Sequence, residues 1–407
     1  MVLALVAGAA PGGAAPTPRP EADPSPLGEV LPGPALRLAT GGDRQTSDGQ
    51  PGLVTTDGRL GGMVRDSHRT SWKVARGVRY TQWRRQDARG RLRIHLLTVR
   101  LDKSRVQVRP VSAGKVPRRG PLTKLLRREK AVAGVNGDFF DIADTGAPLG
   151  VLSSRGKVRH GATIGWPNAL YRAGGRWRTG PLPLRAGVIG HPDVPITNLN
   201  SPWVAPGGIG AYTKAWGTRP GRQVTGETGP VRVVRISNGR VVSNETRLGR
   251  GEPIQGTLLV GREEGAALLK SALPVGTAAG VSTWLDGRPG FAIGGDRPLL
   301  VDGEHRTVDD TVMHPRTAVG VNRSGRRMFL LVVDGRSSRS RGLTMVETAD
   351  LMIELGAYQA LNLDGGGSST MVAPNRKRRR TDVRNTPSDG RERWIPNGVG
   401  IFVRAKR

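Results

Sequence analysis

Two apolar runs near the carboxyl end of the chain, residues 329–333 and 360–363, predict buried strands. Between them, residues 344–356 predict a helix. Thr344 and Glu347 have the spacing of a capping box, apolar residues recur at helical intervals, and a glycine stands where a left-handed C-terminal cap belongs. A strand, a helix and a second strand in this order predict a right-handed crossover between two parallel strands.

Each of these apolar runs ends at an aspartate, Asp334 in the first and Asp364 in the second. Parallel strands end at the same edge of a sheet, and ligands bind at that edge in open sheets with crossover helices. If the two strands are neighbours, they lie about 4.8 Å apart. We therefore expect the two carboxylates to form a candidate active site.

A polar, glycine-rich turn follows Asp364. A ligand can approach a glycine backbone closely, and successive N–H groups can form a nest for an anion. The alternative is an ordinary tight turn, since Asp-Gly is a common turn dipeptide. The turn lacks the motifs of a phosphate loop and of a nucleophile elbow. The turn residues that we expect to bind substrate are Gly365, Gly366, Gly367 and Ser368.

A second candidate group lies far upstream of this turn. Residues 131–135 predict a short buried strand, and Asn136, Asp138 and Phe140 follow it. An aromatic ring beside an amide and a carboxylate suits a sugar, because the ring packs on its apolar face while the polar groups bond to its hydroxyls. The alternative is a turn with two core phenylalanines.

Most of the remaining pattern consists of short strands. Residues 78–83, 91–99 and 106–111 predict an antiparallel meander, and residues 122–130 predict a helix. Asn238-Gly239 between two apolar runs is a strong signal for a type I′ hairpin. The predicted fold class is α+β: a strand-rich mixed sheet with a few flanking helices and one β-α-β crossover near the C-terminus.

The first part of the chain differs in composition from the rest. Pro, Gly, Ala and polar residues dominate there without a sustained period, which predicts disorder. We therefore divide the chain into a disordered segment, 1–65, and one domain, 66–407, with its core motifs in residues 131–403.

The apolar start of the chain, followed by small residues, resembles the end of a signal peptide's apolar region and its cleavage site. The basic residues of such a signal are missing, as they would be if the true start codon lies upstream. We expect a secreted or cell-envelope protein with a remnant signal peptide. No other segment approaches the ~20 apolar residues of a membrane span. The absence of cysteine excludes disulfides and thiolate metal sites.

The formal net charge of +30 raises the question of nucleic-acid binding, and residues 376–380 form the densest basic run. The basic residues are nevertheless scattered over the chain, and no recognised nucleic-acid-binding motif is present. We therefore expect no specific nucleic-acid partner. Attraction to anionic cell-wall polymers or to phosphodiester substrates fits the charge better.

Six segments together resemble the phosphodiester glycosidase family, whose bacterial members are often described as exopolysaccharide-related proteins. The segments occur in the family's order, with one departure at Asp138, where vertebrate members carry a second glycine. They are Asn136-Gly-Asp-Phe-Phe140, Tyr212-Thr213 with Trp216-Gly217, Pro315-Arg316-Thr317-Ala318-Val319-Gly320, Val333-Asp334-Gly335-Arg336, Gly342-Leu343-Thr344, and Leu363-Asp364-Gly365-Gly366-Gly367-Ser368-Ser369.

The resemblance implies an exported hydrolase that cleaves the glycosidic bond between a sugar and a phosphodiester. Such a reaction usually needs one carboxylate as nucleophile or base and, for ordinary leaving groups, a second as acid. Asp138, Asp334 and Asp364 are the candidates for these roles. Arg316 and Arg336 are candidates for clamping the phosphate, because arginine's planar fork matches phosphate oxygens.

Two other function classes fit the same residues. A metal-dependent phosphodiesterase would use the three aspartates as hard oxygen ligands for calcium or magnesium. A non-catalytic binder of cell-envelope polysaccharide would use the site without turnover. We therefore predict no required cofactor and keep a divalent cation, calcium or magnesium, as an open alternative.

Overall fold

The computed structural model describes residues 50–54, 64–376 and 381–404. All of them belong to one compact unit. Most of the expected disordered segment 1–65, including the signal-like start, lies outside the described residues. Its described part contains Leu53–Val54 (β1), which pairs with Val312–Met313 (β24).

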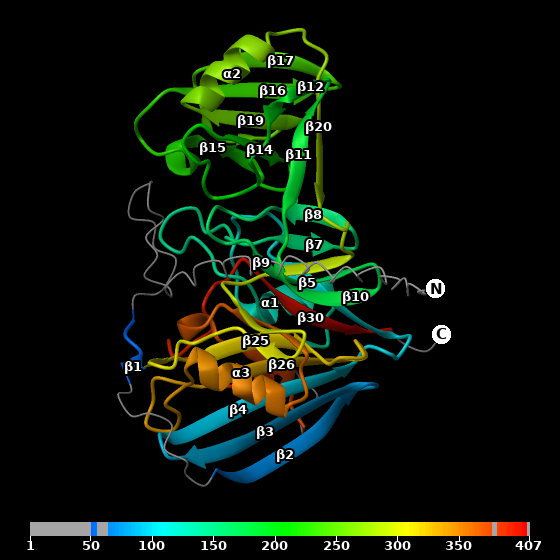
Figure 1. Cartoon of the computed structure of the whole chain (residues 1–407), viewed down its shortest axis with the longest axis vertical. Coiled ribbons are helices and arrows are strands. Elements are labelled where there is room, and N and C mark those ends of the chain that lie inside the picture. The colour runs from blue at the N-terminus through cyan, green and yellow to red at the C-terminus, as the bar shows by residue number, and fades with distance from the viewer. Residues whose placement is uncertain (1–49, 55–63, 377–380, 405–407) are drawn as a thin grey trace, which may run out of the picture. The chain divides into compact units, whose positions relative to one another are not determined.

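The largest sheet has eight strands, and every pair described in it is antiparallel. Figure 1 shows β2, β3 and β4 in blue and cyan, beside β26 and β25. In order across the sheet the strands are β2 (Arg65–Ala75), β3 (Val78–Asp87), β4 (Gly90–Arg100), β26 (Arg327–Val333), β25 (Arg316–Val321), β27 (Gln359–Leu363), β22 (Pro298–Val301) and β23 (Glu304–His305).

A five-stranded sheet shares its core with the inner face of this large sheet. Leu330 and Val332 from the large sheet lie in one buried cluster with Val135 and Ile401 from the smaller one. The core therefore holds the two sheets together and fixes the relation between their edges. The strands of the smaller sheet, in order, are β29 (Thr381–Val383), β28 (Met371–Pro374), β6 (Ala133–Asn136), β30 (Asn397–Val403) and β5 (Val106–Ser112).

Helix α3 (Met345–Glu354) covers the outer face of the large sheet and lies across β25 and β26 in Figure 1. Its Ala349 and Met352 pack in one cluster with residues of those strands. The predicted capping box is confirmed, because Glu347 N donates to Thr344 Oγ1 at 3.1 Å while Thr344 N donates to the Glu347 carboxylate at 2.9 Å.

The remaining strands form smaller sheets, which Figure 1 shows mainly in green. The strands of one five-stranded sheet, in order, are β10 (Arg176–Pro181), β9 (Asn168–Ala173), β21 (Phe291–Gly294), β7 (Leu152–Ser154) and β8 (Lys157–His160). Those of a three-stranded sheet are β12 (His191–Pro195), β11 (Leu184–Ile189) and β20 (Gly280–Leu285). The strands of a second five-stranded sheet are β13 (Asn198–Leu199), β14 (Ile209–Thr213), β19 (Thr257–Arg262), β16 (Val231–Ser237) and β17 (Arg240–Glu245). A two-stranded sheet consists of β15 (Thr218–Pro220) and β18 (Arg250–Pro253).

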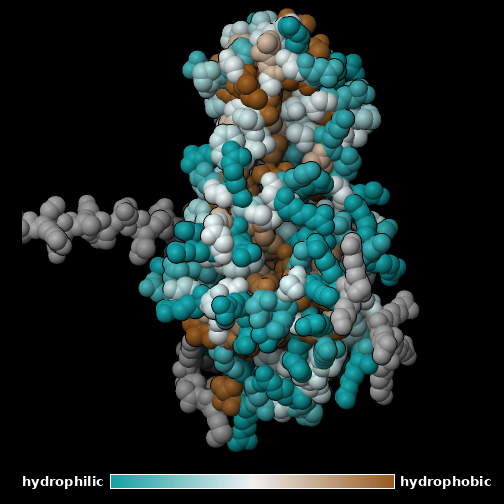
Figure 2. Space-filling model, turned by 90° about the vertical axis from the view of Figure 1, so that its right-hand side faces the viewer, coloured by the Kyte–Doolittle hydropathy of each residue, from teal (hydrophilic) through white to brown (hydrophobic). Residues whose placement is uncertain are grey.

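Short helices complete the fold. Those described besides α3 are α1 (Leu122–Glu129), α2 (Glu264–Ala272) and the 3-10 turns η1 (Gly221–Val224) and η2 (Gly366–Ser368). On the face shown in Figure 2 the surface is mainly hydrophilic, with small hydrophobic areas between the polar ones. The predicted strand-rich character with few helices is confirmed.

The crossover predicted near the C-terminus differs from the observed topology. β26 and β27 run in the same direction, but β25 lies between them and pairs antiparallel with both. The two strands are therefore not neighbours, and the β-α-β crossover between adjacent strands is not confirmed. β25 is fully buried and forms a hairpin with β26, so it occupies the neighbouring position before the chain reaches α3.

The other local predictions are mostly confirmed. β3 and β4 are antiparallel neighbours, α1 covers the predicted helix, and β16 and β17 form the predicted hairpin with Asn238 and Gly239 both at positive φ. The third strand of the predicted meander forms as β5, but its predicted place in the meander is wrong, because β5 pairs with β30 in the smaller sheet. The large sheet is antiparallel rather than mixed, and a parallel pair occurs between β13 and β14.

Candidate active site

The turns that follow β6 and β27 meet at one edge of the core. Asp364 N donates to the carbonyl of Gly137 at 2.9 Å. The side-chain amide of Asn136 donates to the carbonyl of Asp364 at 2.6 Å. Two motifs more than two hundred residues apart in the chain are thus joined directly by hydrogen bonds.

Asn136, which the sequence suggested as a sugar ligand, positions the Asp364 turn. Its side chain is buried, and its amide oxygen accepts from Thr317 Oγ1 at 2.8 Å and from Thr370 N at 3.0 Å. One amide therefore connects β6, β25 and both ends of the glycine-rich turn.

Asp138 is almost completely buried beside this junction. Its Oδ2 accepts from Gly150 N at 2.8 Å, whereas its Oδ1 has no hydrogen-bond partner among the described residues. A Cβ placed on Gly150 or on Gly294 would lie 2.7 Å or 2.6 Å from Oδ2. The Asp138 carboxylate therefore fits in this position because the two glycines have no side chains that would clash with it.

The environment of Asp138 favours its protonated form. Burial raises the pKa of the Asp138 carboxyl well above its usual value, and the negative charges of Asp364 and Asp296 raise it further, against a lowering by the Gly150 N–H. Asp138 and Asp364 therefore interact electrostatically, as two carboxylates of one site would.

Asp296 is a third carboxylate near this pair that the sequence did not single out. Its Oδ1 accepts from Asn362 Nδ2 at 2.8 Å, and its Oδ2 accepts from Arg297 Nε at 3.2 Å. Burial raises the pKa of Asp296 as well. A sequence signal was present, because two glycines precede Asp296 at the end of a short strand, mirroring the glycines that follow Asp364.

The glycine-rich turn is compact. Gly366 N donates to the carbonyl of Pro315 at 2.9 Å, and the N–H groups of Ser368 and Ser369 bond within the turn. These groups are engaged by the protein rather than turned toward an anion. The hydroxyls of Ser368 and Ser369 are buried without hydrogen-bond partners among the described residues, so polar atoms remain for a ligand or water to satisfy.

Arg393 lies over this turn and was not expected from the sequence. A Cβ on Gly367 would overlap its guanidinium and the carboxylate of Asp389, so both side chains pack directly against this glycine. Arg393 and Asp389 form an ion pair at 2.7 Å. The arginine comes from the loop before the last strand, where no motif marks it, and it places its guanidinium, paired with the Asp389 carboxylate, next to the Asp364 turn.

Asp334 lies in a different environment. Its Oδ1 accepts from Thr386 N at 2.9 Å, and its Oδ2 lies 3.6 Å from His95 Nε2. The other ring nitrogen of His95 lies 2.7 Å from the hydroxyl of Tyr80, whose pKa is raised above its usual range by burial. The structure therefore groups Asp334 with a buried histidine and tyrosine.

A loop after β29 connects Asp334 to the glycine-rich turn. Thr386 holds Asp334, while its neighbour Asn385 donates to the carbonyl of Ser369 at 2.9 Å and accepts from Met371 N at 2.8 Å. The Asp334 carboxylate is thus in a separate environment from those of Asp138 and Asp364, but one short segment, residues 385–386, connects it to the turn after Asp364.

The two predicted clamp arginines bond to backbone carbonyls. Arg316 is buried and donates from Nε to Leu343 O at 2.8 Å and from Nη2 to Val312 O at 3.0 Å. Burial lowers the pKa of Arg316 to about 10. Arg336 donates from Nη2 to Gln50 O at 3.0 Å. Both side chains hold neighbouring segments of the chain in place at this edge.

Phe140, the predicted aromatic platform, belongs to the core. Its side chain is 1% exposed and packs in one cluster with Leu122, Leu125 and Leu126 of α1. Its ring faces are therefore covered by protein, as the alternative interpretation of this motif anticipated.

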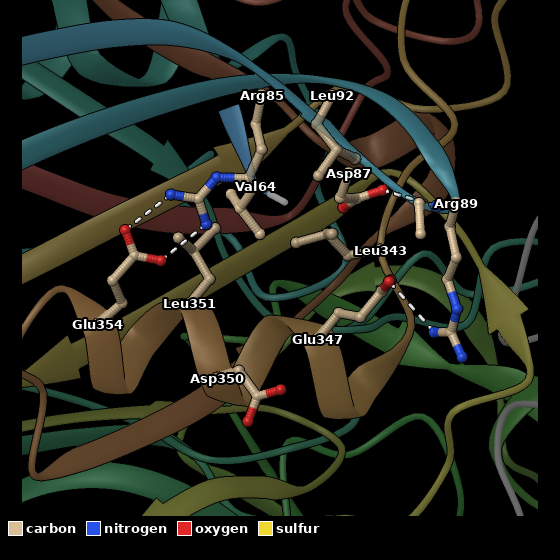
Figure 3. Close-up of a pocket in the computed structure, with 11 residues that line it drawn as sticks. Val64, Arg85, Asp87, Arg89, Leu92, Leu343, Glu347, Asp350, Leu351 and Glu354 are labelled. Atoms are coloured by element: carbon tan, nitrogen blue, oxygen red, sulfur yellow. Dashed lines mark hydrogen bonds and ion pairs between the residues drawn. The ribbon is translucent and has the colours of Figure 1, made fainter. Parts of the chain in front are cut away.

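A pocket shown in Figure 3 lies elsewhere, between α3 and the turn joining β3 to β4, and has a volume of about 200 Å³. Four of its charged groups pair with one another: Arg85 with Glu354 at 2.7 Å, and Arg89 with Glu347 at 3.2 Å. None of the residues predicted for the site lines it. The internal pairing favours a role in holding α3 against the sheet.

Two further structural findings concern metals and membranes. Within the described parts of the chain, no three His, Asp or Glu side chains gather as ligands for a metal ion. No helix in those parts is long and apolar enough to cross a membrane.

Comparison with known proteins finds a family model that matches part of the chain. The family model described as phosphodiester glycosidase matches residues 218–402, so the resemblance seen in the sequence is confirmed for that segment. A mouse protein named N-acetylglucosamine-1-phosphodiester alpha-N-acetylglucosaminidase is 31% identical over 144 residues, which cover 34% of this chain and 28% of the mouse protein. The curated relatives matched are covered over only 11% to 28% of their own lengths.

Two solved structures share the fold. A hypothetical protein from Synechocystis has a TM-score of 0.70 and 22% identity, covering 83% of this chain and 64% of that protein. A Burkholderia pseudomallei protein provisionally named as exported has a TM-score of 0.68 and 19% identity, covering 87% of this chain and 100% of that protein. At these identities the comparisons establish the fold alone.

Proposed function

We propose, from the match of residues 218–402 to the phosphodiester glycosidase family, that this chain hydrolyses the glycosidic bond between a sugar and a phosphodiester. The observation that carries the proposal is the junction of the Asp138 and Asp364 motifs. It brings together two carboxylates whose charges interact, as glycoside hydrolysis commonly requires.

The two carboxylates have environments suited to different roles. The raised pKa of Asp138 suits a proton donor, because a buried carboxyl keeps its proton to higher pH than an exposed one. Asp364 then acts as the nucleophile or the base at the sugar carbon. A pair of titratable groups whose surroundings separate their pKa values is the usual arrangement for acid and base roles.

Arg393 supplies the positive charge of the proposed site. It lies against Gly367 in the turn that follows Asp364, so a phosphate bound at this turn would meet its guanidinium. The leaving phosphodiester gains negative charge as the glycosidic bond breaks, and a cation positioned in advance stabilises that charge. Arg316, with donors bonded to two backbone carbonyls, acts by positioning β25 and its neighbours.

We also propose that the protein works outside the cytoplasm. The apolar start and the Pro-rich tract of the sequence support export. Fractionation of cells that express the native gene, with its own upstream sequence, should find the chain in the medium or the envelope. Accumulation in the cytoplasm would contradict this.

The reaction class is tested by a substrate screen. Sugar-1-phosphodiesters and aryl glycosides of the same sugars are incubated with the protein, with and without a chelator. The proposal predicts free sugar and an intact phosphomonoester from the diesters. Sugar 1-phosphate as product would show cleavage on the other side of phosphorus, and loss of activity in chelator with recovery on adding one cation would favour a metal-dependent phosphodiesterase.

A further inference from the structure

The inner face of β3 and β4 changes character along the strands. Toward the core it carries Tyr80 and Leu97, which are fully buried. Toward the turn that joins β3 to β4, the same face carries Arg84, Arg91 and Arg93. Arg84 and Arg91 are exposed, and Arg93 is half-buried. Basic side chains thus line the path from solvent to the buried part of this face.

These arginines repel one another. Arg84 stands directly opposite Arg93 in the ladder between β3 and β4, and Arg91 follows two residues along on the same face. Side chains directly opposite in an antiparallel pair have Cβ atoms about 4.5–5.5 Å apart, and like charges there are destabilising. No ion pair or hydrogen bond joins the side chain of any of the three arginines to another described residue. A bound anion would offset the repulsion.

Two acidic side chains of the neighbouring strands β2 and β3 are already paired with other arginines. Asp66 binds Arg85 at 2.7 Å, and Asp87 binds Arg341 at 2.7 Å. Among the described residues, these carboxylates are therefore not available to neutralise the basic face.

A groove of about 590 Å³ lies along this basic face, and Arg339 from the loop after β26 joins its wall. Arginine forms two parallel hydrogen bonds to phosphate oxygens through its planar fork. On a strand, alternate residues repeat at about 6.6–6.8 Å, so the arginines present a series of phosphate-binding groups rather than one. We call this the arginine groove.

The arginine groove begins next to Asp334. Asp334 N donates to the carbonyl of Arg93 at 3.0 Å, and Ser340 Oγ joins the two by accepting from Arg93 N and donating to Asp334 O. From Asp334 the loop with Thr386 and Asn385 continues to the glycine-rich turn after Asp364. The groove is thus connected through the backbone to the proposed reaction site.

We propose that the arginine groove binds a phosphodiester-linked anionic chain that forms the aglycone side of the substrate. This inference rests on the proposed function, because it takes the phosphate beyond the scissile bond as the start of the chain. The proposed substrate is a sugar attached to a polymer with several phosphodiesters, and several arginines of the groove bind that polymer at once.

The test compares two double variants of equal charge. Arg84→Gln with Arg91→Gln removes two exposed groove arginines. Arg176→Gln with Arg178→Gln removes two exposed arginines from the edge strand β10, where neither forms an ion pair with a described residue. Binding of poly(glycerol phosphate), and of glycerol phosphate for comparison, is titrated at several salt concentrations, and melting temperatures show that each variant is folded.

The groove variant should bind the polymer at least about tenfold more weakly than the wild type at moderate salt. Its slope of log K against log salt should fall by about 1.4, since each single-strand phosphate contact contributes about 0.7. The β10 variant should keep the wild-type affinity within about twofold. Equal losses in the two variants would overturn the proposal, because general attraction would then explain the binding.

Two more measurements separate this proposal from others. Single-stranded DNA of equal charge should bind more weakly than poly(glycerol phosphate), and tighter binding of DNA would make the groove a nucleic-acid surface. Hydrolysis of a small sugar-1-phosphodiester by the wild type is measured separately. Polymer binding without that hydrolysis refutes the proposed function but not the groove, whereas hydrolysis without polymer binding refutes the groove alone.

Discussion

Asp364 is the residue whose charge the proposed reaction needs most. Asp364→Asn keeps the size of the side chain and leaves both backbone hydrogen bonds to residues 136 and 137 in place. We predict that kcat falls at least about a hundredfold, near the lower end of the usual effect of acid–base catalysis. Melting temperature should change little. A folded variant with nearly wild-type kcat would remove Asp364 from the mechanism.

Asp138 should give activity a dependence on pH. If its proton is donated in the reaction, the rate falls as pH rises through the raised pKa of this carboxyl. Asp138→Asn cannot ionise, so this limb should be missing from its pH profile. The check is kcat/KM measured across neutral pH for both proteins, and identical profile shapes would contradict the assignment.

The same carboxyl should also make stability depend on pH. Because its folded pKa is raised, it favours the folded state fully below the unfolded value of about 3.9 and loses that contribution as pH rises toward the folded pKa. The slope approaches about 1.4 kcal/mol per pH unit for one proton. Urea unfolding from pH 4 upward should show a loss in the wild type that is smaller in Asp138→Asn.

The sequence singled out Asp138 and Asp364 as candidates because each follows a short buried strand beside glycine. It could not identify Arg393, which lies in a loop and approaches the site through contact with Gly367. It also could not separate Asp334 from the other two carboxylates. That separation depends on which strand stands between β26 and β27, and no local pattern records strand order.

At the scale of elements, Asn136 is the connection between the two sheets at the site. Asn136→Ala removes its three hydrogen bonds, which it makes to a buried carbonyl, a buried hydroxyl and a buried N–H. We predict a loss of unfolding free energy of at least about 1–3 kcal/mol. Because the Asp364 turn is released, kcat should fall as well.

Thr317→Val is the matched control for that variant. It removes one of the hydrogen bonds to the Asn136 amide and preserves the shape of the side chain. Its effect on stability should be smaller, about 0.5–1.5 kcal/mol. Chemical unfolding and kcat are measured for both variants. Equal kcat in Asn136→Ala and the wild type would show that the turn holds its position without this amide.

The cap of α3 offers a contrasting prediction. Thr344→Ala removes the hydroxyl that accepts from Glu347 N and donates to Asp310. Loss of such a cap typically costs about 1 kcal/mol, so the melting temperature should fall. Since α3 carries none of the proposed site residues, kcat at a temperature where the protein is folded should stay within about twofold. A large loss of kcat would mean that α3 positions the site.

Local signals at this scale were sufficient for α3, α1 and the hairpin of β16 and β17, because caps, helical spacing and turn residues act within a few positions. They were insufficient for β5. Its apolar pattern predicts a strand, yet its partner β30 lies almost three hundred residues later, so nothing nearby in the sequence specifies the pairing.

At the scale of the whole chain, the proposed function depends on two sheets that share one core. β6 brings Asp138 from the smaller sheet, and β27 brings Asp364 from the larger one. Their packing, rather than either motif alone, creates the site. The arginine groove gathers part of the positive charge that the sequence linked to anionic partners.

The most direct test of the central claim is the position of the oxygen that water delivers. A small sugar-1-phosphodiester is hydrolysed by the wild-type protein in ¹⁸O-labelled water, and both products are analysed by mass spectrometry without delay. Attack at the sugar carbon, as proposed, places ¹⁸O in the released sugar and leaves the phosphomonoester unlabelled. Label in the phosphate would show attack at phosphorus and would contradict a glycosidase mechanism.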